Sequence, residues 1–407
     1  MSSALRKRVG SGVLSQAVAS GSNLLVSLFA ARELSLSGFG SFAAAYSVYI
    51  ALVGLHRALI LEPALGRRVP SLDADRRVIS SSVGASAAAA SVLVIVGLLL
   101  GNEFGRAIFL LGLVLPVLAV LDAGRYLAFS NQQPSRALAI DVAWAVAIVV
   151  GFGASVQFSI SLSAPAVIGL WGAASLAGVV LVARWWGLAP PGLSWMLECW
   201  SIGWRYSAQW AATTGAAQVA LLGLGVFAGV GAVGAVRGGQ LLFGPLNVLF
   251  AGFLAVVIAE GARLSDSRLL RLAAATSALY SMVAAALTGV LVFMPDQVGE
   301  SLLGASWQSA NAVLVPIGLS AVMGAIAAGP IGSLRSLMAA DTTLRITVIT
   351  APLYLFVPVA MAVQAGSVGF AWGLFVCSSW SALVWWVGFG LRVSGRVESR
   401  VELQARG

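Results

Sequence analysis

The stretch Leu14–Arg68 is the starting point for the fold: LSQAVASGSNLLVSLFAARELSLSGFGSFAAAYSVYIALVGLHRALILEPALGRR. It holds two apolar runs joined by a short link at 32–38, and each run has the roughly 20 residues that cross a lipid bilayer. Polar residues interrupt both runs: Gln16, Asn23, His56, Arg57 and Glu62. An ionisable side chain inside a membrane span needs a partner or a wet cavity, so it marks a candidate functional site. We interpret the stretch as two transmembrane helices that line a cavity, with further helices enclosing it.

Composition extends this interpretation to the whole chain. The 407 residues are 59% hydrophobic and only 10% charged, with a mean hydropathy of +0.94. A soluble domain would carry roughly a quarter charged residues. Apolar runs fill nearly the whole sequence and lack the alternation of a membrane β-barrel. We therefore expect an all-α polytopic membrane protein.

The apolar runs predict twelve membrane spans. We expect them at 10–31, 39–61, 80–100, 106–128, 137–157, 164–183, 206–227, 233–258, 272–293, 309–332, 343–364 and 367–391. The basic start followed by an apolar run also resembles a signal peptide. This run is longer than the apolar part of a signal peptide and contains several polar residues, so we expect it to remain as the first span.

The basic residues predict the orientation. All but four of the 24 Lys and Arg residues fall near the chain ends or at every second connection between spans; the four are Arg32, Arg57, Arg106 and Arg237. By the positive-inside rule, both termini face the cytoplasm. The same bias accounts for the net charge of +9, so we expect membrane lipids and no nucleic acid as partners.

Tryptophans and prolines mark a connector at 184–205, which we expect at the membrane interface. It separates an N-terminal lobe at 1–183 from a C-terminal lobe at 206–391, each with six helices. A basic cytoplasmic tail at 392–407 follows, and we expect it to form a short helix on the lipid surface. Faint similarities between the two halves are typical of the internal repeats of secondary transporters.

Several functional classes are excluded. The single lysine, Lys7, lies outside any Walker-type phosphate loop. One histidine (His56) and two scattered cysteines (Cys199 and Cys377) cannot form an ordinary zinc or haem site, so we expect no metal and no cofactor. The outward connections are short and poor in acidic residues, which argues against a membrane glycosyltransferase or polymerase. No repeated filter motif indicates a channel. A carrier, not an enzyme, remains.

Motifs along nearly the full length resemble the polysaccharide-transporter branch of the multidrug/oligosaccharidyl-lipid/polysaccharide (MOP) exporter superfamily, which includes O-antigen and teichoic-acid flippases. Besides Gln16 and Asn23, the motifs are ARELSLSGFGSF (31–42), HRALILEP (56–63), LDAGRYLAFSNQQPSRALAIDVAW (121–144), RGGQLLFGPLNVL (237–249) and GASWQSA (304–310).

The resemblance implies two six-helix lobes around a central cavity that opens alternately to each face of the membrane. It also implies a polyprenyl-pyrophosphate-linked oligosaccharide as substrate, moved across the plasma (inner) membrane of a bacterium. Lipid II flippases of this superfamily usually have fourteen helices. The twelve spans expected here therefore favour a polysaccharide flippase over a cell-wall-precursor flippase.

The charged candidates lie in the first lobe. Arg57 has a guanidinium suited to bidentate phosphate binding, although the side chain could instead extend to the cytoplasmic interface. Asp122 and Arg125 are three residues apart on one helix and can pair, with Asp141 on the same side. A structural ion pair is the simpler interpretation of these three. In the functional one, Arg125 contacts phosphate, and Asp122, Asp141 or Glu62 binds a coupling proton or sodium ion.

The remaining candidates are polar. Arg237, with Gln240 one turn further on, could contact an acidic group of the substrate or extend to the outer surface. Gln16, Asn23 and Gln209 could bind sugar hydroxyls, but hydrogen bonds between helices are the commoner role of such amides. Two other functions stay open: a cation-coupled small-molecule or drug antiporter of the same superfamily, and a non-transporting membrane scaffold.

Overall fold

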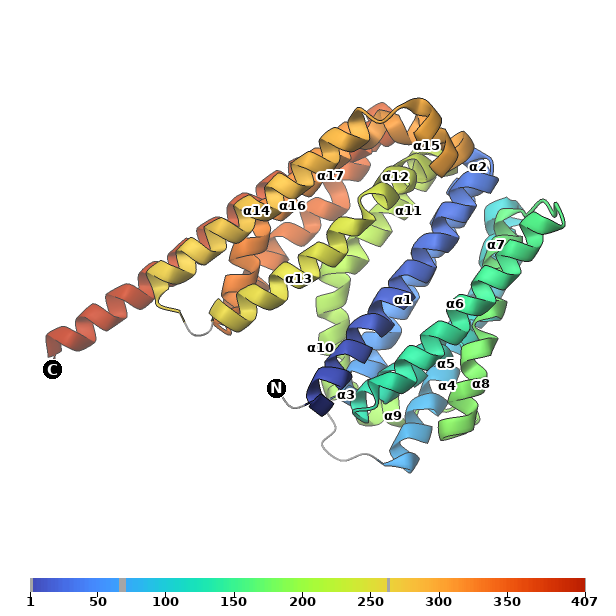
Figure 1. Cartoon of the computed structure of the whole chain (residues 1–407), viewed down its shortest axis with the longest axis horizontal. Helices are drawn as coiled ribbons and strands as arrows, with labels where there is room; N and C mark the ends of the chain where they lie inside the picture. The colour runs from blue at the N-terminus through green and yellow to red at the C-terminus, as the bar shows by residue number, and fades with distance from the viewer. Residues whose placement is uncertain (1–2, 66–70, 262–263, 407) are drawn as a thin grey trace. The chain divides into compact units, whose positions relative to one another are not determined.

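The structure, a computed structural model, describes residues 3–65, 71–261 and 264–406. The basic residues Arg67, Arg68 and Arg263 of the orientation argument lie outside these ranges. Every element in the described ranges is a helix (Figure 1). Nine of the described helical stretches are long and apolar enough to cross a membrane. The chain is therefore an all-α, multi-pass membrane protein, as the composition predicted.

The first seven segments of the described chain are built from these helices: α1 (Ser3–Glu33); α2 (Leu36–His56) with η1 (Arg57–Leu61) and α3 (Glu62–Leu65); α4 (Leu72–Leu100); α5 (Glu103–Ser130); α6 (Pro134–Gln157); α7 (Ala164–Ala174) with α8 (Leu176–Trp186); and, after the short α9 (Ser194–Glu198), α10 (Trp200–Trp210), η2 (Ala211–Gly215) and α11 (Ala216–Ala228). Both η1 and η2 are π-helical turns within a longer helix.

Five further segments follow in the described chain: α12 (Val230–Leu242) with α13 (Gly244–Gly261); α14 (Asp266–Val292); α16 (Trp307–Ser336), preceded by α15 (Asp296–Leu303) and the 3₁₀ turn η3 (Gly304–Ser306); and α17 (Ala340–Arg406). Ala365 and Gly366 have non-helical backbone angles and divide α17 into two helices. Each of the twelve predicted spans thus coincides with a helical segment, and the predicted break between residues 364 and 367 is confirmed.

Several predicted starts were too late, and in the third and ninth spans the reason is that charged residues were assigned to loops. The third span begins at Leu72 rather than 80, after Ser71 accepts a hydrogen bond from the Ala74 N–H. Asp73 and Asp75 occupy its first turn, where carboxylates stabilise the positive end of the helix dipole. The ninth span begins at Asp266 rather than 272, with the same kind of first turn. The expected outward link at 32–38 is also mostly helical, since α1 ends at Glu33 and α2 begins at Leu36.

The described chain forms two compact units. The N-terminal unit comprises Met1–Gln218 with Leu302–Ala305, and the C-terminal unit comprises Val219–Ser301 with Ser306–Gly407. In the N-terminal unit α5 is the central helix, packed against α2, α4, α6, α7 and α8, while α1 lies beside α6 (Figure 1). In the C-terminal unit α16 packs against α12, α13, α14 and α17. The fourth and tenth spans thus hold corresponding central places.

Candidate functional site

The central helix of the N-terminal unit carries two charged side chains within a membrane span. Asp122 is 2% exposed and Arg125 is 7% exposed, and both lie on α5, which is long and apolar enough to cross a membrane. The Arg125 Nη1 donates to Asp122 Oδ1 over 3.3 Å. The structure thus contains the pair that the three-residue spacing allows.

Arg57 joins this pair from the second span. Its Nε and Nη2 donate to the two carboxylate oxygens of Asp122 over 2.6 Å and 2.8 Å, which is the bidentate geometry that strengthens an Arg–carboxylate contact. Arg57 is the first residue of η1, where the helix widens into a π turn; such turns are frequent at functional sites. The Arg57 Cζ also lies 5.7 Å from the centre of the Tyr126 ring.

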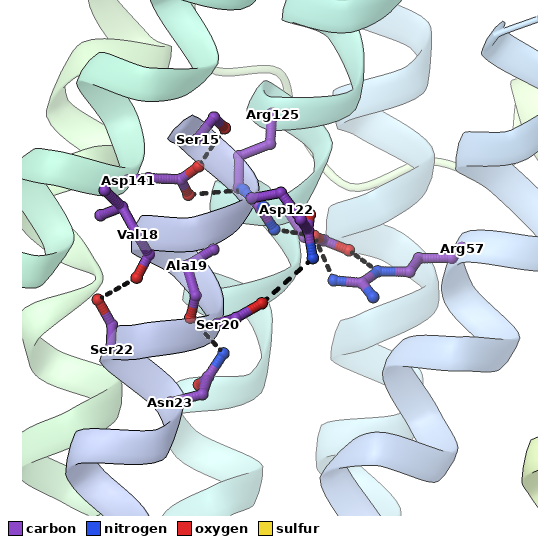
Figure 2. Close-up of polar contacts among 11 residues, drawn as sticks. Ser15, Val18, Ala19, Ser20, Ser22, Asn23, Arg57, Asp122, Arg125 and Asp141 are labelled. Carbon is purple, nitrogen blue, oxygen red and sulfur yellow. Dashed lines mark hydrogen bonds and ion pairs between the residues drawn. The ribbon is translucent and has the colours of Figure 1, made fainter. Parts of the chain in front are cut away.

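Asp141 of α6 extends the row on the other side. Its Oδ1 forms an ion pair with Arg125 Nε at 2.6 Å, and its Oδ2 accepts a hydrogen bond from Ser15 Oγ of α1 over 2.5 Å. Figure 2 shows the resulting row of five side chains, Ser15, Asp141, Arg125, Asp122 and Arg57, which we call the charge row. It connects four membrane-spanning segments of one unit.

The charge row is buried at one end and accessible at the other. Asp141 is 0% exposed, whereas the Arg57 side chain is 35% exposed. Its two guanidinium groups and two carboxylates balance in formal charge, which lowers the cost of placing them in the membrane. Of the four charged members, Arg57 thus has the most exposed side chain. The Arg57 side chain points to the carboxylate of Asp122 and does not extend away from the helix bundle.

The polar candidates are not part of the charge row. Gln16 is exposed on α1 and donates to Ser20 Oγ over 3.4 Å, while Asn23 donates to the Ala19 carbonyl of the same helix over 3.0 Å. Both amide groups thus donate within α1 and not to another helix. Glu62, on α3, and Gln209, on α10, are both exposed.

Arg237 and Gln240 belong to the other unit. Both are half-buried on α12, and Arg237 Nη1 donates to Gln240 Oε1 over 3.4 Å. This pair has the one-turn spacing that the sequence predicted. Cys377 is buried and Cys199 is half-buried.

Ser15 and Tyr126 were missed as site residues. Ser15 lies 126 residues from its partner Asp141, and no spacing rule relates the two positions. The ion pair between Arg57 and Asp122 was also missed. A general signal for it was present, because the two side chains have opposite charges and were expected at the same side of the membrane, where each needs a partner. The sequence did not indicate which of the helices would meet.

No protein-family model matches the sequence, and no curated protein matches it. Solved structures do share its fold. An inward-facing multidrug resistance MATE transporter of the MOP superfamily aligns over 94% of this chain and 98% of that chain, with a TM-score of 0.73 and 13% identity. The lipid II flippase MurJ, in an inward closed conformation, aligns over 94% of this chain and 89% of that chain, with a TM-score of 0.69 and 11% identity.

A MOP superfamily transporter from Pyrococcus furiosus aligns over 96% of this chain and 95% of that chain, with a TM-score of 0.57 and 12% identity. At such low identity the similarity concerns the fold alone. The chain therefore shares the fold of these solved transporters, and the charge row lies among the first, second, fourth and fifth helical segments of the described chain.

Proposed function

We propose that this chain is a flippase that moves a polyprenyl-pyrophosphate-linked oligosaccharide across a bacterial plasma membrane by alternating access, for the synthesis of a surface polysaccharide such as O-antigen or teichoic acid. The fold shared with a lipid II flippase supports this proposal, together with the sequence motifs described above. The observation that carries it is the charge row, with a partly exposed arginine at its accessible end.

Arg57 is the proposed phosphate contact. Its guanidinium can bind a pyrophosphate with the same bidentate geometry that it now uses for Asp122. A pyrophosphate that takes these same two N–H groups competes with Asp122 for Arg57. Arg125 and Asp141 are too deeply buried to meet the substrate directly; Arg125 holds Asp122 in place, and Asp141 holds Arg125. This changes the role expected for Arg125 from phosphate contact to positioning residue.

A proton is the proposed coupling ion. Protonation of Asp122 removes the charge that holds Arg57 and so frees the guanidinium for the substrate. A sodium ion fits less well, because arginine nitrogens already lie 2.6 Å from both Asp122 and Asp141. In the described residues, no group of three or more His, Cys, Asp or Glu side chains is arranged to hold a metal ion.

The proposal is tested in proteoliposomes that contain a fluorescent polyprenyl-pyrophosphate sugar, with transport measured as the fraction protected from an external quencher. Arg57→Ala should lower the transport rate at least tenfold. The double variant R57A/D122N should be equally inactive; it keeps the charge row neutral, so its failure cannot be attributed to an unpaired buried charge. Arg106→Ala is the matched control, because Arg106 is exposed near the other end of α5. Native-like transport by R57A would show that Arg57 does not bind the substrate. Absence of transport by the unmodified chain would contradict the proposed flippase function.

A second candidate function is export of cationic drugs or other small molecules in exchange for a cation. The similarity to a multidrug resistance MATE transporter favours it, whereas the paired state of the buried carboxylates does not, since a cationic drug needs a carboxylate that is free to accept it. Efflux of ethidium from cells that overproduce the chain distinguishes the two functions. A non-transporting scaffold predicts that Arg57→Ala leaves both activities, and the surface polysaccharide, unchanged.

A further inference from the structure

A cavity of about 180 Å³ lies within the N-terminal unit, and no side chain of the charge row lines it. Its walls come from α2 with η1, from α4 and from α5, all of them membrane-spanning segments. We call it the His56 cavity, and its lining residues are Tyr49, Leu52, Val53, Leu55, His56, Leu59, Ile60, Ala85, Ser86, Ala89, Leu115 and Ala119. An engineered apolar cavity of roughly 150 Å³ takes up benzene, so this space can hold a small organic group.

The walls are almost entirely hydrocarbon. Only Tyr49, His56 and Ser86 bring polar atoms, and the Ser86 hydroxyl already donates to the Ser82 carbonyl of its own helix over 2.6 Å. No acidic or basic side chain other than the imidazole lines the space. A charged ligand would lose its hydration here without gaining a counter-charge. The cavity therefore selects a neutral, mostly apolar molecule.

The His56 imidazole is the exception in this wall. Neither ring nitrogen is accessible to solvent, and neither has a hydrogen-bond partner among the described residues. Shielding both nitrogens without partners is unfavourable, because each loses its bond to water. A half-turn about χ2 exchanges the nitrogen and carbon edges of the ring. Here that rotation gives up no hydrogen bond, so the ring is free to offer a nitrogen to a ligand in the cavity.

We propose that the His56 cavity binds the hydroxyl-bearing end of a neutral lipid or a similar small apolar alcohol from the bilayer. A neutral imidazole has one donor and one acceptor, and a hydroxyl group can pair with either. The branched side chains of Val53, Leu59 and Leu115 fit a compact, branched hydrocarbon body. Half of the lining side chains are partly exposed, so the wall of the cavity is not closely packed at these positions. The inference does not depend on the proposed flippase activity, because it uses no residue of the charge row.

The test uses the purified chain in lipid nanodiscs and a short branched alcohol that carries a diazirine. After illumination, labelled peptides are identified by mass spectrometry. We expect labels on the α2 and α4 peptides that line the cavity, and competition by the same alcohol without the diazirine. In a second probe a methyl group replaces the hydroxyl. The difference in labelling between the two probes measures the contribution of the hydrogen bond to binding. Labelling elsewhere only, or equal labelling by both probes, would overturn the proposal.

Two pairs of variants localise the effect. Ala89→Phe fills the cavity and should reduce labelling at least tenfold, whereas Ala88→Phe, on the exposed face of the same helix, should leave it unchanged. Ala85→Leu is a smaller filling change that serves if A89F does not fold as judged by gel filtration. His56→Leu should weaken binding of the alcohol roughly two- to tenfold, the effect of one hydrogen bond, and leave the methyl probe unaffected. Native labelling by A85L or by A89F would contradict the assignment.

Discussion

The charged side chains inside this membrane protein are arranged as alternating signs. Arg57, Asp122, Arg125 and Asp141 follow one another with the closest contacts at 2.6, 3.3 and 2.6 Å, and Ser15 occupies the remaining oxygen at the buried end. A single guanidinium or carboxylate in the bilayer would be strongly unfavourable. The neutral row removes most of that penalty, so each member depends on its neighbours. Under the proposed function, the same dependence would let a proton or a pyrophosphate disturb the row.

Replacing Arg125 by methionine should lower the free energy of unfolding by about 3–5 kcal/mol, because Asp141 is then left buried without its cation. Thermal unfolding in detergent, followed by circular dichroism, measures the loss. The double variant R125M/D141L removes both charges and should recover most of the stability. If R125M were as stable as the native chain, the stability would not depend on the ion pair between Arg125 and the buried Asp141.

Residue-level reasoning from the sequence found the four charged members of the row, but not Ser15, and only one of its contacts. The pair Asp122–Arg125 follows from helix geometry, since residues three apart share a face. The contacts of Arg57 and of Ser15 join residues 65 and 126 positions apart, and they depend on which helices pack together. Apolar helices carry little information about their neighbours, so these contacts could not be predicted.

At the scale of helices, hydrophobicity predicted where a helix crosses the bilayer better than where it begins. The spans at 343–364 and 367–391 were separated correctly because two residues, Ala365 and Gly366, lie between their apolar runs. The starts at Leu72 and Asp266 were missed because a helix can extend beyond the bilayer with charged residues in its first turns. The π turn η1 was also missed, since its sequence, RALIL, has the composition of an ordinary helix.

The break in α17 depends on the backbone of Gly366, which has φ of 55° and ψ of −135°. A side chain at this position is strained by roughly 1–3 kcal/mol. Gly366→Ala should therefore destabilise the chain by that amount in thermal unfolding. Gly390, in the same helix, has ordinary angles and no atom within 4 Å of an added Cβ, so Gly390→Ala is the control and should be neutral or slightly stabilising. Equal behaviour of the two variants would contradict the assignment of a sharp break.

Close packing joins the second span to α10. A Cβ at Gly54 would lie 2.1 Å from Cε2 of Trp210, and one at Gly203 would lie 2.8 Å from the Leu59 carbonyl oxygen. Gly54→Ala should cost about 1–3 kcal/mol, because the indole must move out of a filled site. Gly153→Ala, on α6 with no atom within 4 Å, is the matched control. A native unfolding temperature for G54A would show that the indole can move freely.

For the molecule as a whole, composition and span counting predicted the class of fold, and the solved MOP superfamily structures share it. The assignment of lobes at 1–183 and 206–391 stays a prediction; the two compact units divide at Gln218 and Val219, within the seventh segment. The functional assignment depends on the ligand, which neither hydrophobicity nor helix packing encodes. A shared fold serves proteins with different substrates.

The orientation in the membrane is testable without a substrate. The distribution of basic residues predicts that both termini are cytoplasmic. Green fluorescent protein fused to either end should therefore be fluorescent in a bacterium, and alkaline phosphatase at either end should be inactive. Fusions after Asn102 should show the opposite pattern, since that connection faces outward in the same prediction. Active phosphatase at the C-terminus would contradict an even number of spans.

The packing of α9 and α10 against the preceding spans has a consequence for experiments with fragments of the chain. Trp195, of α9, donates from its backbone N–H to Ser81 Oγ over 3.2 Å and from Nε1 to the Ile60 carbonyl over 3.0 Å, and Trp210 of α10 packs on Gly54. The connector and the first part of the seventh segment therefore belong structurally to the preceding six spans. If the gene is divided within codons 187–193, the second polypeptide carries a piece that docks onto the first. Co-expressed halves should then copurify through a tag on either one, and Gly54→Phe should release them.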